Sequence, residues 1–164
     1  MRWQLLEAVT EVVPGRHAVG RACTRLPDEL LADHFPSLPL VPGVLLVEAA
    51  AHLGGLLVVA SVHAERGLLV FPVLSLVRQA KLRRFVTPGA DVTLRASLVA
   101  LRPESALCRI EAQGDGARCA SMSLMFVFEP EGGVPGGDAP RLRAFLESEL
   151  RRVGSPWQPA PRAA

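Results

Sequence analysis

The sequence predicts a small α+β protein in which an antiparallel sheet wraps around one long helix. The central observation is an apolar stretch from Val44 to Ala60 whose only ionisable side chains are Glu48 and His52. A helix that is apolar on all sides is normally a buried one. Strand-like runs follow this stretch, separated by turn signals at intervals of about ten residues. The length of 164 residues fits one domain with a sizeable core.

Two strands joined by a tight turn are expected first, at residues 4–13 and 16–25. Pro14 and Gly15 stand between them and form a strong turn signal. A single helical turn is expected next, over residues 26–33. It delivers the chain to the segment that precedes the central helix.

Three prolines shape the segment before the central helix, at positions 36, 39 and 42. Proline fixes φ and has no backbone N–H, which predicts an extended loop from His34 to Val41. Helix becomes allowed at Gly43, and Gly67 is the candidate C-cap at its far end.

Strand-like runs follow the helix at residues 68–77, 79–86, 91–101, 106–113 and 117–128. Their apolar and β-branched residues, with Gly, Pro and Asp between the runs, are typical of an antiparallel sheet. The last two runs form the clearest hairpin, since a Gly-Asp-Gly turn joins them.

The chain divides into a body and a C-terminal extension. We expect the body over residues 1–128, a Gly/Pro-rich linker over 129–140, a short amphipathic helix over 141–153 and a disordered tail over 154–164. The helix should dock on the body through apolar residues at helical spacing: Leu142, Phe145, Leu146 and Leu150.

Composition argues against several classes of protein. A net charge of +2, no tyrosine and 5% aromatic residues disfavour a nucleic-acid partner. Cys23, Cys108 and Cys119 are odd in number and widely spaced, so we expect free thiols in a reducing cytoplasm rather than disulfides or a metal site. The N-terminus shows no secretion signal.

Residues 38–62 are apolar enough to be considered as a membrane-spanning segment. Two internal prolines, a Gly-Gly pair and two ionisable groups count against it. We therefore expect no membrane span.

His34 and Glu48 are the first candidates for chemistry. His34 lies in the proline-stiffened loop, and Glu48 lies in the apolar helix that the loop leads into. The backbone N–H groups of Gly43 and Val44 at the helix start are suited to stabilising an oxyanion. From spacing alone an alternative stays open, in which His34 only supports the loop and the backbone or His52 satisfies Glu48.

The stretch HFPSLPLVPGVLLVEAAAHLGG, residues 34–55, resembles the motif of the 3-hydroxyacyl-ACP dehydratases of type II fatty acid synthesis, a hotdog-fold family. A second stretch, AKLRRFVTPGADVTL at residues 80–94, is similar to the family's basic and aromatic strand with its Pro-Gly turn. The resemblance covers residues 4–128 in outline and implies a hotdog fold.

The resemblance also implies roles for individual residues. His34 matches the catalytic histidine and Glu48 the catalytic acid, with Glu rather than Asp favouring the dehydratase branch over the dehydratase-isomerase branch. Gly43 and Val44 match the amides that hold the thioester carbonyl. The histidine of one protomer meets the carboxylate of the other in this family, which implies a homodimer or a trimer of dimers. No metal or redox cofactor is implied.

On physical grounds His34, titrating near neutrality, suits the base that removes a proton from C2. We expect the apolar helix to bury Glu48 and raise its pKa, so that it stays protonated and serves as the acid. Three positions depart from the family pattern: Asp33 replaces a usual Gly, His52 replaces a usual Gln, and Asp91 falls one place late. Asp33 and His52 are therefore candidates for tuning the catalytic pair. The alternatives are that Asp33 is only a solvated loop residue and that His52 is a hydrogen-bonded core histidine.

A basic cluster follows at the second matching stretch. On a regular strand Lys81 and Arg83 would share one face, and Arg78 and Arg84 the other. Such a run is usually only a solvated strand, but an acidic carrier protein gives it a use in docking.

The function expected from all of this is dehydration of 3-hydroxyacyl-ACP to trans-2-enoyl-ACP, a lyase reaction in fatty acid or polyketide-like biosynthesis. Two alternatives remain on the same fold: a catalytically silent acyl-binding subunit that supports an active partner, and an acyl thioesterase.

Overall fold

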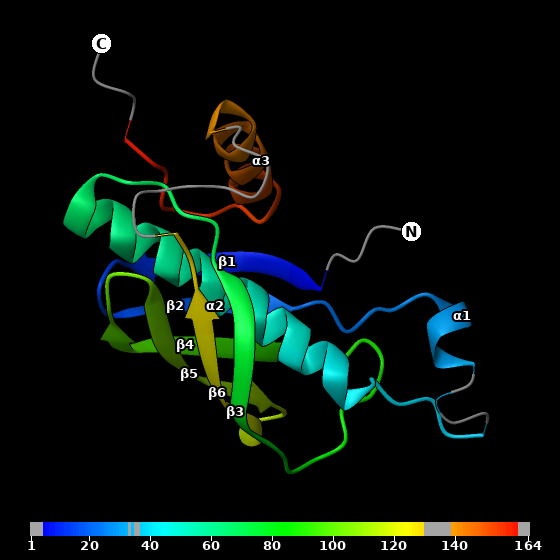
Figure 1. The fold of residues 1–164 in the computed structure, drawn as a ribbon. Helices are drawn as coiled ribbons and strands as arrows, with labels where there is room; N and C mark the ends of the chain where they lie inside the picture. The colour runs from blue at the N-terminus through cyan, green and yellow to red at the C-terminus, as the bar shows by residue number, and fades with distance from the viewer. Residues whose placement is uncertain (1–4, 33, 35–36, 130–138, 161–164) are drawn as a thin grey trace.

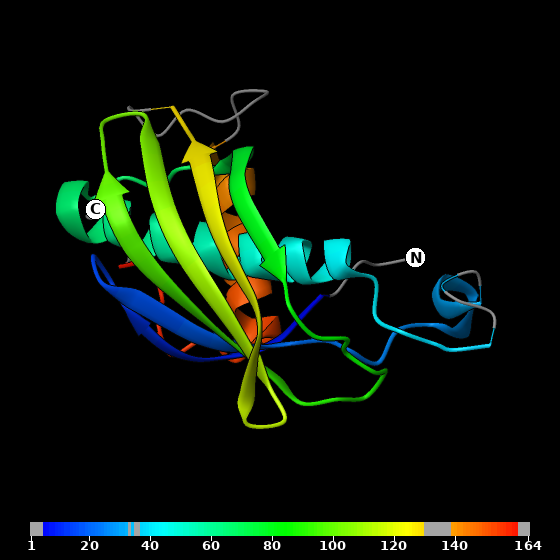
Figure 2. The same ribbon diagram turned by 90° about the horizontal axis from the view of Figure 1, so that it is seen from below.

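The computed structural model describes residues 5–32, 34, 37–129 and 139–160. It is an α+β arrangement in which one six-stranded antiparallel sheet curves around a long helix (Figures 1 and 2). The elements in chain order are β1 (Leu6–Val13), β2 (His17–Ala22), α1 (Asp28–Leu31), α2 (Gly43–Arg66), β3 (Val73–Leu82), β4 (Val92–Leu101), β5 (Ser105–Gly114), β6 (Ala117–Val127) and α3 (Ala139–Arg152). The predicted fold class is therefore confirmed.

The sheet has the strand order β1-β2-β4-β5-β6-β3, so β1 and β3 are its two edges. Every neighbouring pair is antiparallel. Tight turns join β1 to β2 and β5 to β6 at the places where Gly15, Asp115 and Gly116 adopt positive φ. Both hairpins stand where the turn signals of the sequence placed them.

The strand β3 differs from what the sequence predicted. The runs at 68–77 and 79–86 were expected as two strands, but they contain a single strand, Val73–Leu82, preceded by a non-strand segment. Its pairing with β6 slips between Leu74 and Leu76 and again between Val77 and Gln79. These irregularities let the strand continue where the alternation of the sequence broke.

The core lies between α2 and the concave face of the sheet. Leu53, Leu57 and Val58 of α2 are fully buried against Ile110, Leu124 and Phe126 of the sheet. Gly54 permits this close approach, since a Cβ atom there would lie only 3.0 Å from Cζ of Phe126. The helix begins at Gly43 and ends at a left-handed Gly67, as predicted.

By length and composition α2 would suffice to cross a membrane, but 67% of its most apolar window is buried inside this chain. The sheet provides that burial. The apolar character of α2 is therefore accounted for by the core.

The helix α3 packs over α2 and the β1 edge of the sheet (Figure 1). Leu146, Leu150 and Val153 are buried, whereas Phe145 is 56% exposed. The N–H of Val9 in β1 donates to the carbonyl of Val153 at 2.8 Å. The predicted linker falls almost entirely outside the described residues.

The tail expected to be disordered from Gly154 is described as far as residue 160 and lies against the body. The ring of Trp157 meets the ring of His63 edge to face, with centroids 5.9 Å apart. The N–H of Ala160 donates to Nε2 of His63 at 3.1 Å. Residues 161–164 lie outside the described part of the chain.

Candidate functional site

The start of α2 supplies backbone donors that no side chain caps. Pro42 precedes the helix in an extended conformation and provides no side-chain cap, as proline cannot. The N–H groups of Gly43 and Val44 therefore stand at the positive end of a helix of 24 residues. Leu82 of β3 packs where a side chain at Gly43 would stand, which explains a glycine at this position.

Glu48 and His52 form a pair on α2. Nε2 of His52 lies 3.0 Å from Oε1 of Glu48. The Glu48 side chain is 47% exposed and that of His52 is 39% exposed, because the sheet covers the opposite side of the helix here. Glu48 is thus not buried within a single chain as we had expected, and His52 is not a core histidine.

His34 is held by backbone hydrogen bonds in the segment between α1 and α2. Its N–H donates to the carbonyl of Leu31 at 2.9 Å, and its carbonyl accepts from the N–H of Leu40 at 3.2 Å. Both views show α1 projecting away from the sheet (Figures 1 and 2). Asp33 lies outside the described residues.

The segment after β3 borders the helix start. The N–H of Val41 donates to the carbonyl of Val86 at 2.8 Å, which ties this segment to the residues before α2. Large apolar side chains remain exposed here, including Val44 at 69% and Phe85 at 84%. A surface of this kind usually serves an interface or a binding site.

The four basic candidates are all exposed: Arg78, Lys81, Arg83 and Arg84. Their expected alternation does not hold beyond Leu82, where β3 ends. The N–H groups of Arg83 and Arg84 both point to the carbonyl of Cys119, at 2.7 and 3.3 Å. Arg78 lies at the second irregularity of β3.

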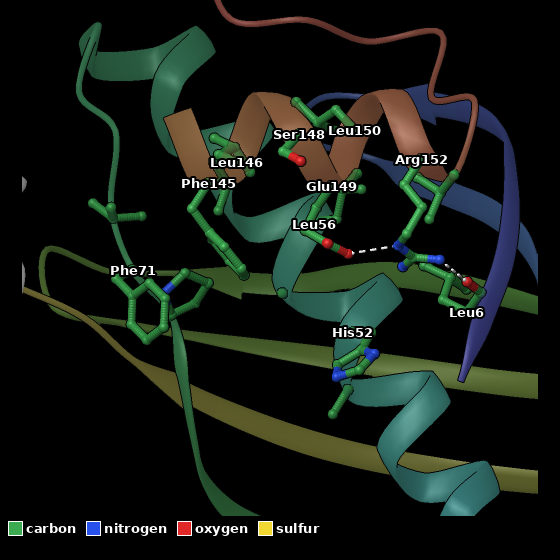
Figure 3. A pocket seen from close by; sticks show the side chains of 16 residues that line it. Leu6, His52, Leu56, Phe71, Phe145, Leu146, Ser148, Glu149, Leu150 and Arg152 are labelled. Atoms are coloured by element: carbon green, nitrogen blue, oxygen red, sulfur yellow. Dashed lines mark hydrogen bonds and ion pairs between the residues drawn. The ribbon is translucent and has the colours of Figure 1, made fainter. Parts of the chain in front are cut away.

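A pocket of about 740 Å³ opens between α2 and α3. Figure 3 shows His52 at one side of it and Phe71, Leu56 and Phe145 around its apolar part. Two charged residues of α3 also border it, and they satisfy each other, since Nε of Arg152 lies 2.8 Å from Oε2 of Glu149.

The cysteines are free thiols. Burial raises the pKa of Cys108 to about 12, and burial is also the main cause that raises the pKa of Cys119. Neither thiol is a nucleophile at neutral pH. Among the described residues, no group of three His, Cys, Asp or Glu side chains is arranged to hold a metal ion.

The pocket beneath α3 and the exposure of Phe85 were not predicted from the sequence. The stripe Glu48, His52, Leu56 and Val59 was readable at helical spacing. The sequence could not predict that α3 covers this stripe, because the linker before α3 carries no signal of where the helix docks.

Comparison with known proteins finds a FabA-like domain over residues 2–122. The chain is 31% identical over 123 residues to the 3-hydroxyacyl-[acyl-carrier-protein] dehydratase FabZ of Clostridium acetobutylicum, which covers 75% of this chain and 85% of that one. The FabZ protein of Ligilactobacillus salivarius is 32% identical over the same number of residues, covering 86% of its own length.

Solved structures share the fold at low identity. The smu.793 protein of Streptococcus mutans, solved with acetyl CoA, has a TM-score of 0.60 at 9% identity and covers 78% of this chain and 91% of its own. A hypothetical thioesterase of Streptococcus pneumoniae, solved with coenzyme A, has a TM-score of 0.57 at 12% identity and covers 73% and 83%. The sheet wrapped around one helix is therefore a known fold, the hotdog fold.

Proposed function

The chain belongs to the FabA-like domain family, and from this premise we propose that it dehydrates 3-hydroxyacyl-ACP thioesters to trans-2-enoyl-ACP. The observation that carries the proposal is the helix start. There, uncapped amides, a carboxyl group one and a half turns further along and a histidine-bearing loop occur within one short stretch of chain.

In the proposed reaction His34 removes a proton from C2, and Glu48 protonates the hydroxyl group at C3. The C3–O bond breaks, a C2–C3 double bond forms, and water leaves. The N–H groups of Gly43 and Val44 donate to the thioester oxygen, where negative charge develops. His34 then returns its proton to solvent and Glu48 regains one. Every step is carried by protein side chains and amides.

A homodimer is part of the proposal. The helix α1, which directly precedes the His34 segment in the chain, projects away from the sheet (Figures 1 and 2), and a second copy is the proposed source of the Glu48 that meets His34. The edge strand β3 supports this reading, because within the described part of the chain it pairs with β6 alone, and it exposes Leu76, Val77 and Leu82. A long apolar edge strand is a template for pairing with another chain. Such pairing would also shield Glu48 from water.

Acyl carrier protein is the proposed partner, and the exposed cluster of Arg78, Lys81, Arg83 and Arg84 the surface that receives it. Each is positively charged at neutral pH, which suits an acidic carrier. We place this activity in the cytoplasm, which the three free thiols support.

The test is conversion of 3-hydroxyacyl-ACP to enoyl-ACP by the wild type and by Glu48→Gln, with folding checked by circular dichroism. The variant keeps the size of the side chain but has no proton to give at neutral pH. We expect its turnover to fall by about 100-fold or more. Wild-type turnover in the variant would remove Glu48 from the mechanism.

Hydrolysis of an acyl thioester is the second candidate, because structures described as thioesterases share the fold. The product separates the two reactions: dehydration leaves an enoyl group on the carrier, whereas hydrolysis releases a free acid. A folded wild type that forms neither product would support the third reading, a silent acyl-binding subunit.

A further inference from the structure

We infer that α3 roofs a compartment that receives the distal part of a long acyl chain. This inference rests on the proposed function and specifies its substrate class. The roof lies outside the region that matches the FabA-like domain, which ends at residue 122, whereas α3 begins at Ala139. The compartment is thus an addition of this chain to the matched domain.

The compartment continues the face of α2 that carries the proposed acid. Glu48, His52, Leu56 and Val59 are spaced so that they form one stripe along the helix. His52 joins the two regions, since it bonds Glu48 and also lines the pocket (Figure 3). A chain that reacts beside Glu48 can therefore pass His52 and run along the same stripe beneath α3.

The lining suits an alkyl chain. Most of the wall is apolar and comes from three separate segments: Leu56, Val59, Val70, Phe71, Pro72 and Phe145. The volume of about 740 Å³ falls within the range of small-molecule sites. The two charged side chains of α3 that border the pocket have partners, because Arg152 forms an ion pair with Glu149 and donates a hydrogen bond to the carbonyl of Leu6 at 3.0 Å.

The length of the stripe determines which acyl-chain lengths can reach the compartment. Eleven residues separate Glu48 from Val59, which corresponds to about 16 Å at a rise of 1.5 Å per residue. Because carbon–carbon bonds of about 1.5 Å zigzag at tetrahedral angles, each bond advances an extended chain by about 1.25 Å, and roughly thirteen bonds span this distance. Long acyl chains therefore fill the compartment, and a four-carbon chain does not reach it.

The roof is fixed to the body rather than loosely placed. Its buried residues Leu146 and Leu150 pack into the core cluster. Its end is bonded to β1, through the N–H of Val9 and the carbonyl of Val153. Such a fixed wall can discriminate between chain lengths, since lining side chains have little room to move away.

Gly55 is the position at which to fill the compartment. It lines the pocket, and a Cβ atom added there would be 3.6 Å from Cγ of Pro72 and 3.9 Å from Cε1 of Phe126, which is ordinary contact. Gly55→Leu should therefore fold, and leucine is also the better helix former. Ala64→Leu, at an exposed position near the end of α2, is the matched control.

The experiment compares kcat/KM for 3-hydroxybutyryl-ACP and 3-hydroxyhexadecanoyl-ACP in the wild type and both variants. We expect the ratio of long-chain to short-chain kcat/KM to fall about 10-fold or more in Gly55→Leu and to stay at its wild-type value in Ala64→Leu. A wild-type ratio in Gly55→Leu, or an equal fall in both variants, would overturn the inference. If Gly55→Leu fails to fold, Phe145→Ala removes one wall at a half-exposed position and should lower the same ratio.

A second readout separates this inference from the proposed reaction. Fluorescence of cis-parinaric acid, an eighteen-carbon polyene acid, reports chain binding without turnover. If the wild type dehydrates no substrate but binds this probe saturably, and Gly55→Leu loses that binding, the compartment stands and the proposed function fails. Equal binding by the wild type and Gly55→Leu would overturn the compartment.

Discussion

Nε2 of His52 lies 3.0 Å from Oε1 of Glu48, one helical turn along the same face of α2. The pair is half exposed in the single chain, so it is accessible to a substrate or to a second copy. His52 therefore contacts the proposed acid directly, in the position where the family resemblance predicts a glutamine.

Replacing His52 tests whether that hydrogen bond matters. Glutamine can still hydrogen-bond to Glu48, so His52→Gln should retain turnover. His52→Leu removes the partner and should lower kcat by about 10-fold, the effect of losing one hydrogen bond of about 1.4 kcal/mol. The measurement is the rate of enoyl-ACP formation at saturating substrate. Equal rates in His52→Leu and the wild type would show that Glu48 acts without its neighbour.

His34→Ala tests the proposed base. Removing a general base should lower the dehydration rate by about 100-fold or more, while the melting temperature changes little because His34 is only partly buried. His63→Ala is a useful comparison, since His63 contacts the tail rather than the helix start. Near wild-type turnover in His34→Ala would exclude the base role.

The fold was largely predictable because its signals are local. Pro14 and Gly15, Gly67, and the Gly-Asp-Gly turn each mark an element boundary that the structure confirms. The error at β3 arose because its irregular pairing with β6 interrupts the alternation in the sequence without ending the strand. Only the partner strand reveals that continuity.

The candidate site was less predictable than the fold. The pairing of Glu48 with His52 follows from helical spacing, and the structure shows it. The exposure of Glu48 does not follow, since an apolar sequence cannot tell which side of a helix its own sheet covers. The pocket depends on where α3 docks, and the bond between Val9 and Val153 that fixes it joins the two ends of the chain.

Charge reversal at Lys81 and Arg83 tests the carrier surface. Lys81→Glu with Arg83→Glu should weaken binding of acyl carrier protein about 10-fold at low salt, and the difference should shrink as salt is added, because exposed charges are screened. Arg16→Glu with Arg25→Glu changes the net charge equally at two exposed positions elsewhere and should have a smaller effect. Isothermal titration with the carrier protein measures both. Unchanged affinity of the first variant at low salt would reject the surface.

Ser61 is expected to hold the first turn against α2. It is buried, its Oγ accepts from the N–H of Gly15 at 2.8 Å, and its hydroxyl donates to the carbonyl of Leu57 at 2.6 Å. Ser61→Ala should lower the free energy of unfolding by about 1 kcal/mol, since the turn amide loses its partner. Urea denaturation measures this, with the exposed Ser75→Ala as control. An equal fall in the free energy of unfolding for the two substitutions would show that the buried hydrogen bonds of Ser61 contribute no more to stability than an exposed one.

Thiol reactivity should separate the three cysteines. With the pKa of Cys108 raised by burial from 9.0 to about 12, only about one molecule in ten thousand carries its thiolate at pH 8. We expect Ellman's reagent to modify Cys23 in the native protein, and Cys108 and Cys119 only after unfolding in urea. Cys23→Ser should then leave no fast-reacting thiol.

The same burial makes stability depend on pH in a defined direction. The pKa of Cys108 is higher in the folded than in the unfolded state, so below pH 9 both states keep the proton and stability is unaffected by this group. As pH rises from about 9 to about 12, the unfolded state loses the proton first, and the free energy of unfolding falls. Urea denaturation at pH 8 and pH 10 measures that fall, which Cys108→Ala should reduce. An identical pH dependence in the variant would mean that other groups control alkaline stability.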